Sequence, residues 1–206
     1  QKYRKRNFIK NTHSGYSFKF GYWGRVSLRK ARNTVNDGKI SHEGVPLDVL
    51  EVDQDRDVII DIGAHFGIYS IILGSINNTT KVHSFEPDEY NYKILNKNVD
   101  LNGFEKEQIE THQCLVSEES GSVTFFIDSH KDGGVSHTAN PTHDHQDYRE
   151  TTVNSISISE LCSEEDFSQP WIKIDAEGSE LGILRDVFES RQIESVKGLV
   201  ELHLSR

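Results

Sequence analysis

The chain has 206 residues, a formal net charge of −10 and two cysteines. This length fits one domain, and the acid excess argues against nucleic acid as a partner, because phosphate binding needs a basic surface. No run approaches the roughly 18 apolar residues of a membrane span and no secretion signal is visible, so we expect a cytoplasmic protein with buried free thiols.

The charge is unevenly distributed along the chain. Residues 1–36 contain ten Lys or Arg and no Asp or Glu, so the remainder is strongly acidic. We predict a basic N-terminal extension over residues 1–50, with a short strand or hairpin near residues 15–23 and a helix over residues 26–39. A solvated arm is the simplest interpretation, although the charge would also suit an anionic surface. Residues 51–206 then form one globular cofactor-binding domain.

A strand, a tight turn and a helix follow one another without a spacer in residues 58–69. The turn contains Gly63 and Gly67, which lack the Cβ atoms that would hold a ligand away from the backbone. A helix beginning near Phe66 would direct its free N–H groups toward the same place. The sequence therefore predicts a cradle for a nucleotide cofactor.

The spacing of the glycines discriminates between cofactors. The dinucleotide fingerprint G-x-G-x-x-G has a middle glycine that makes room for a pyrophosphate, and this turn lacks it. Asp61 would repel a pyrophosphate but attract the ammonium of an amino-acid group, which favours S-adenosyl-L-methionine over a nicotinamide dinucleotide. The predicted cofactor contacts in this segment are Asp61, Gly63, Ala64, His65, Phe66 and Gly67.

A second acid ends the next predicted strand, residues 81–85. Glu86 lies 19 residues beyond the last glycine of the cradle and is followed by Pro87. An acid about 20 residues after the glycine turn can accept hydrogen bonds from ribose hydroxyls. We therefore add Glu86 and Pro87 to the predicted cofactor site. The alternative is that Glu86 and Asp88 only cap the following helix.

Strands and helices alternate through the rest of the chain. This alternation predicts an α/β fold with a parallel sheet, helices on both faces and a ligand at the carboxyl ends of the strands. The expected elements are a helix over 89–101 stopped at 102–103, strands over 109–116, 123–127 and 152–156, a short helix through Leu161, and strands over 171–174 and 198–204.

A long polar segment, residues 128–150, interrupts this alternation of strands and helices. It contains His143, His145 and Asp147, but alternate residues in a loop are a weak metal signal, so we expect no metal site. A flap over the substrate is the favoured interpretation.

A second acidic strand end follows residues 171–174. Lys173, Asp175, Glu177 and Glu180 lie there, where side chains of a parallel strand face the ligand crevice. The alternative is that the three acids only stabilise the start of the next helix.

The last predicted strand carries two further polar residues. Alternation along this strand places Glu201 and His203 on one face, beside the acidic strand end.

With these residues placed, the sequence resembles the FkbM-type family of S-adenosylmethionine-dependent methyltransferases. Residues 60–67, 84–87 and 171–180 carry the resemblance, which extends over about residues 42–204. It implies a class I methyltransferase (Rossmann-like) fold and an enzyme that transfers a methyl group, often to a hydroxyl of a sugar, glycolipid or polyketide. Family members usually continue into a closing antiparallel hairpin, so we expect the chain to be truncated before it.

We therefore predict O-methylation of a small-molecule or glycan acceptor, which requires alignment of the acceptor oxygen and a base for its proton. Asp175 or His203 would serve as the base, with Glu177 a third catalytic candidate. The predicted substrate-binding residues are Lys173, Glu180 and Glu201. The alternatives are a non-catalytic cofactor-binding or assembly protein and, less favoured, a nicotinamide-dependent oxidoreductase.

Overall fold

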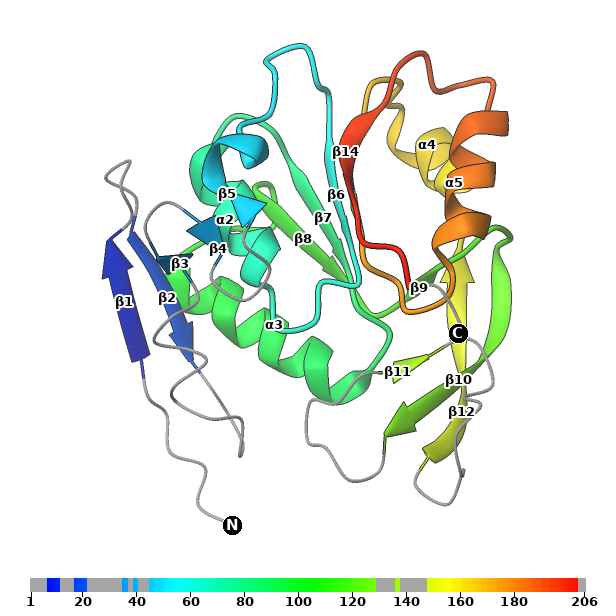
Figure 1. Cartoon of the computed structure of the whole chain (residues 1–206), viewed down its shortest axis with the longest axis horizontal. Helices are drawn as coiled ribbons and strands as arrows, with labels where there is room; N and C mark the ends of the chain where they lie inside the picture. Colours follow the sequence, from blue (N-terminus) through cyan, green and yellow to red (C-terminus); the bar gives the residue numbers. More distant parts are fainter. Residues whose placement is uncertain are drawn as a thin grey trace.

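The structure is a computed structural model that describes residues 7–11, 17–21, 35–36, 39–40, 45–128, 136–137 and 148–203 (Figure 1). Within these residues a parallel sheet of five strands forms the centre, in the order β14-β13-β6-β7-β8. The predicted α/β class with a parallel sheet is confirmed. The strands are β6 (Ile59–Ile62), β7 (Val82–Phe85), β8 (Ile109–His112), β13 (Trp171–Ile174) and β14 (Lys197–Val200).

Helices cover both faces of this sheet, as predicted. One face carries α2 (Ile68–Ile76) and α3 (Glu89–Asn102), and the other carries α4 (Ile158–Glu165) and α5 (Glu180–Glu189). Alternate side chains of a strand enter the two apolar clusters: Ile59 packs under α2, and Ile60 packs under α4 and α5. β6, β7 and β13 are buried at every position, including the polar residues Asp61, His83, Ser84 and Lys173 that they contain.

The two helices of the first face begin and end at defined caps. Asp88 caps α3, because its side chain accepts a hydrogen bond from the Asn91 N–H, and Gly103 ends the helix with φ 78°. The predicted stop at Asn102-Gly103 is confirmed. α2 begins at Ile68, after Gly67 with φ 82°, and so starts slightly later than the sequence suggested.

A second sheet stands beside the first and was not predicted. Its order is β11-β10-β12-β9, antiparallel except for the pair β12 and β9. The single strand predicted over residues 109–116 is wrong, because the chain leaves the central sheet after His112 and enters the second one at Leu115. The strands are β9 (Leu115–Val116), β10 (Gly121–Asp128), β11 (Ser136–His137) and β12 (Tyr148–Ile156).

The N-terminal region contains short antiparallel strands. β1 (Asn7–Asn11) pairs with β2 (Ser17–Gly21), which agrees with the predicted strand or hairpin, and β2 lies against α3. The predicted helix over residues 26–39 is wrong where it can be compared, because β3 (Val35–Asn36) and β4 (Lys39–Ile40) are strands.

The remaining N-terminal elements lead into the central sheet. β5 (Val45–Pro46) pairs with β4, and the 3-10 helix η1 (Leu47–Leu50) follows it. Residues 26–34, and His143, His145 and Asp147 of the predicted flap, lie outside the described residues. Among the described helices, none combines the length and apolar character required to cross a membrane.

The last strand is shorter than predicted. β14 ends at Val200, so Glu201 and His203 lie on the segment after it and are not placed by strand alternation.

We predict that Asn98→Ala lowers the free energy of unfolding by about 1 to 3 kcal/mol. Asn98 is 1% exposed, and its Nδ2 donates to the Phe66 carbonyl at 2.8 Å, which ties α3 to the turn before α2. Chemical denaturation measures the loss. The control is Asn102→Ala, which removes the bond from Asn102 Nδ2 to the Asn98 carbonyl inside α3. Equal losses for the two variants would contradict this role.

Candidate active site

A cavity of about 430 Å³ lies at the carboxyl ends of β6, β7 and β13. This is the edge of a parallel sheet at which ligands bind in α/β folds. The predicted site residues that line it are Gly63, Ala64, His65, Phe66, Glu86, Pro87, Lys173, Asp175, Glu177, Glu201 and His203. Asp61, Gly67 and Glu180 are not among its lining residues.

The two cradle glycines are required by protein packing. Gly63 has φ +73°, and a Cβ there would lie 1.8 Å from the Asp175 carbonyl oxygen, so the turn after β6 touches the turn after β13. A Cβ on Gly67 would lie 2.6 Å from the Leu95 Cδ1 atom. The space beside each glycine is therefore occupied by protein atoms, although Gly63 also lines the cavity. That the two glycines make room for a ligand stays a prediction.

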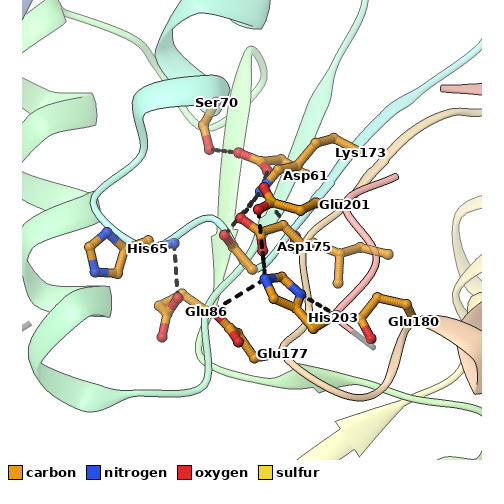
Figure 2. A network of polar contacts seen from close by, with 12 residues as sticks. Asp61, His65, Ser70, Glu86, Lys173, Asp175, Glu177, Glu180, Glu201 and His203 are labelled. Atoms are coloured by element: carbon orange, nitrogen blue, oxygen red, sulfur yellow. Dashed lines mark hydrogen bonds and ion pairs between the residues drawn. The ribbon is translucent and has the colours of Figure 1, made fainter. Parts of the chain in front are cut away.

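Glu86 joins the turn after β6 to the turn after β7 (Figure 2). One carboxylate oxygen accepts from the His65 N–H at 2.8 Å and the other from the Asp88 N–H at 2.9 Å. Asp88, not Glu86, provides the helix cap. Burial raises the pKa of Glu86 to about 7. Glu86 also lines the cavity, and its carboxylate has lone pairs that these two bonds do not use.

Asp61 is fully buried beneath the cavity and does not reach it. Its Oδ2 accepts from the Ser70 hydroxyl at 2.6 Å, and its Oδ1 lies 3.7 Å from Lys173 Nζ (Figure 2). Burial raises the pKa of Asp61 against the attraction of Lys173. The direct attraction that we predicted between Asp61 and an ammonium group is therefore not supported by this placement.

Lys173 is a buried cation that connects two strand ends. Its Nζ lies 3.2 Å from Asp175 Oδ2 and 3.3 Å from the Gly63 carbonyl, and it also lies over the Tyr69 ring. The side chain is 5% exposed. Lys173 therefore counters the charges of Asp61 and Asp175 at the point where the two turns meet.

Glu180 orients His203. The His203 Nδ1 lies 2.8 Å from Glu180 Oε1, and both Glu180 oxygens accept from the Gly178 N–H at 3.0 to 3.1 Å (Figure 2). Glu180 is 3% exposed. Glu180 thus fixes the imidazole ring, whereas we had expected it to contact the acceptor.

The other ring nitrogen of His203 faces carboxylates. Nε2 lies 3.5 Å from Glu177 Oε1, 3.7 Å from Glu201 Oε1 and 3.8 Å from Asp175 Oδ1. These side chains come from the turn after β13 and the segment after β14. The structure thus brings all three predicted catalytic candidates together.

This proximity changes the pKa values of the cluster. Partial burial of His203 favours its neutral form, but the bond to Glu180 and the charges of Glu177 and Asp175 outweigh it and raise its pKa. Burial, aided by Asp175, raises the pKa of Glu177 against the opposing charge of His203. The charge of each group therefore affects the protonation of the other.

Two groups among the described residues have a spacing that would suit a metal ion. Asp175, Glu177 and His203 form the first, and His83, Glu110 and His112 form the second. In the second group His83 Nδ1 already contacts His112 Nε2 at 3.0 Å, and lysine ammonium groups lie 2.7 Å from both Glu110 oxygens.

The cavity has an apolar wall that the sequence did not reveal. It comes from the second sheet, which follows the break at residues 113–114. That break contains neither Gly nor Pro and so gives no sequence signal. The missed lining residues are Ile62, Ile68, Tyr69, Phe85, Asn91, Cys114, Leu115, Val116, Phe125 and Ala176.

The parallel sheet and its two helical layers define a doubly wound α/β fold, in which ligands bind at the carboxyl ends of the strands. The chain belongs to the FkbM methyltransferase family: the family model described as "Methyltransferase FkbM domain" matches residues 61–206. This confirms the predicted family and supports S-adenosyl-L-methionine as the cofactor. A search of curated proteins gives no match.

Several solved structures resemble the chain at low identity. The methyltransferase FkbM from Methylobacillus flagellatus KT is 19% identical over 69% of this chain and 32% of that chain, with a TM-score of 0.43. The tRNA (uracil-54, C5)-methyltransferase of Pyrococcus abyssi, solved with S-adenosyl-L-homocysteine, is 12% identical over 91% of this chain and 33% of that chain, with a TM-score of 0.45. M. jannaschii TYW2, solved with AdoMet, is 18% identical over 52% of this chain and 43% of that chain, with a TM-score of 0.34. The chain thus spans less than half of each.

We predict that Gly63→Ala destabilises the protein far more than Gly103→Ala. Both glycines have nearly the same positive φ, which costs an alanine about 1 to 2 kcal/mol. A Cβ at position 103 meets nothing within 4 Å, whereas one at position 63 meets the Asp175 carbonyl at 1.8 Å. Denaturant unfolding of both variants measures the difference. Similar losses would show that the two turns do not depend on this contact.

Proposed function

We propose that the chain is an S-adenosyl-L-methionine-dependent O-methyltransferase that acts on a hydroxyl of a small-molecule or glycan acceptor. The observation that carries this proposal is one cavity with two different polar sides. Glu86 lies on the β7 side, and the cluster of Asp175, Glu177 and His203 lies on the β13 and β14 side. The family assignment supplies the reaction class.

The residues on the β7 side suit the nucleoside of the cofactor. Backbone N–H groups fix both oxygens of Glu86, so its remaining lone pairs are held in place for ribose hydroxyls. Ala64, His65 and Pro87 would complete the contacts. When bound, S-adenosyl-L-methionine supplies a methyl group on a sulfonium, whose carbon–sulfur bond breaks with its electron pair left on sulfur.

The cluster on the other side would receive the acceptor. An attacking hydroxyl must lose its proton as its oxygen bonds to carbon, and Asp175 and His203 are the proposed acceptors of that proton. Glu177, whose Oε1 lies 3.5 Å from His203 Nε2, would stabilise the positive charge that His203 gains with the proton. Glu201, whose side chain is 52% exposed, offers a route for the proton to solvent.

Two further features of the cavity bear on the acceptor and favour one without phosphate groups. Phe125, 3% exposed, and Val116 line the cavity from the second sheet and would exclude water from the reacting groups. The carboxylates of Glu177 and Glu201 would repel phosphates, which disfavours a nucleic-acid acceptor.

We predict that Glu86→Gln weakens binding of S-adenosyl-L-homocysteine about tenfold or more at pH 8, because a hydrogen bond to a charged group is worth roughly 1.5 to 3 kcal/mol. Burial places the pKa of Glu86 at about 7, so wild-type affinity should rise between pH 6 and pH 8 as the carboxylate ionises. Calorimetry at both pH values tests this. Glu89→Gln, on the exposed side of α3, is the control. A wild-type pH dependence that persists in Glu86→Gln would refute the assignment.

We also predict that Asp175→Asn and His203→Ala each lower the rate of methyl transfer about 10²- to 10⁴-fold, the usual contribution of a positioned base. Transfer of labelled methyl groups to a panel of glycosides and glycolipids gives the rate. Cofactor affinity, measured in parallel, should change little, and exposed Glu164→Gln is the control. Full activity of both variants would reject the assignment. Wild-type protein that binds cofactor but transfers to no acceptor would favour a non-catalytic cofactor-binding protein.

A further inference from the structure

We propose that Asp175, Glu177 and His203 bind a divalent transition-metal ion, and that the ion holds the acceptor hydroxyl. This inference rests on the proposed function and adds a cation that the reaction class alone does not require. Each of the three side chains offers one ligand atom, and these atoms all lie within 4.8 Å of one another.

The separations of the ligand atoms suit a bound ion. His203 Nε2 lies 3.5 Å from Glu177 Oε1 and 3.8 Å from Asp175 Oδ1. Both distances exceed the usual hydrogen-bond length of about 2.7 to 3.2 Å. Neighbouring ligands of an ion with bonds of about 2.1 Å lie roughly 3.0 to 3.4 Å apart, so small side-chain movements would complete the site.

The imidazole is already oriented as a metal ligand. Glu180 holds Nδ1 at 2.8 Å, which directs Nε2 toward the carboxylates (Figure 2). A carboxylate on the far nitrogen of a ligating histidine fixes the ring and raises its basicity. Glu180 is itself buried and held by the Gly178 N–H, so this support is rigid.

The negative charge on this side of the cavity also favours a bound cation. Asp175, Glu177 and Glu201 all lie within 3.8 Å of the same imidazole nitrogen. The nearby ammonium of Lys173 is shared with buried Asp61. A divalent ion among these carboxylates would offset their mutual repulsion.

The donor set indicates which ion binds. One imidazole nitrogen with carboxylate oxygens suits Mn²⁺, Co²⁺ or Zn²⁺ better than Ca²⁺ or Mg²⁺, which prefer oxygen ligands. An ion here would lower the pKa of a bound acceptor hydroxyl. Because Asp175 and His203 would then bind the ion, the hydroxyl proton would pass to Glu201 instead and from there to solvent, while the oxygen keeps the electron pair that forms the bond to carbon.

Mn²⁺ binding to chelator-treated full-length chain tests the inference, with the electron paramagnetic resonance signal of free Mn²⁺ as the readout. We expect one site in the wild type, at least tenfold weaker binding in His203→Ala and Glu177→Gln, and about 10- to 100-fold weaker binding in Glu180→Gln. The matched control is His112→Gln, which disrupts the other histidine cluster and should leave the affinity unchanged. Thermal unfolding and binding of S-adenosyl-L-homocysteine check that each variant folds.

The outcomes separate the two proposals. Absence of Mn²⁺ binding, or binding lost in His112→Gln but kept in His203→Ala, overturns the metal site. If S-adenosyl-L-homocysteine binds and methyl transfer persists in excess chelator, the metal site is wrong and the proposed function stands, with the cluster taking the proton directly. If the wild type binds Mn²⁺ but no S-adenosyl-L-homocysteine, the proposed function fails instead.

Discussion

The contact between the turns after β6 and β13 determines the geometry of the site. At Gly63 the backbone approaches the Asp175 carbonyl so closely that no side chain fits between them. The neighbouring Lys173 ammonium lies against the Gly63 carbonyl and the Asp175 carboxylate, which fixes the same two turns electrostatically. The carboxylates at the end of β13 therefore lie beside the cradle after β6, and one cavity serves both.

Buried charge is distributed unevenly around this contact. Asp61 and Lys173 form a buried pair under the cavity, where mutual attraction must offset the loss of hydration. Burial raises the pKa of Glu86 to about 7, although the bonds from the Asp88 and His65 N–H groups oppose this rise. The two acids at the ends of β6 and β7 thus have different roles: one organises the protein, and the other faces the cavity.

The sequence predicted those features that depend on local chemistry. A glycine turn marked the end of β6 and an acid marked the ends of β7 and β13, which placed Glu86 and Asp175 at the same edge of the sheet. The sequence did not predict contacts between segments that are far apart in the chain. The pairing of Glu180 with His203 and the reason for Gly63 both depend on how separate turns meet. Helical spacing near residues 35–40 was misleading because β3 and β4, which are separated by only residues 37 and 38, pair with each other there.

A crystal structure of the chain with S-adenosyl-L-homocysteine tests the central claim most directly. The account predicts the ribose hydroxyls at hydrogen-bond distance from Glu86 and the sulfur facing the side of the cavity that carries Asp175 and His203. A nucleoside bound elsewhere, or a ribose directed away from Glu86, would contradict it.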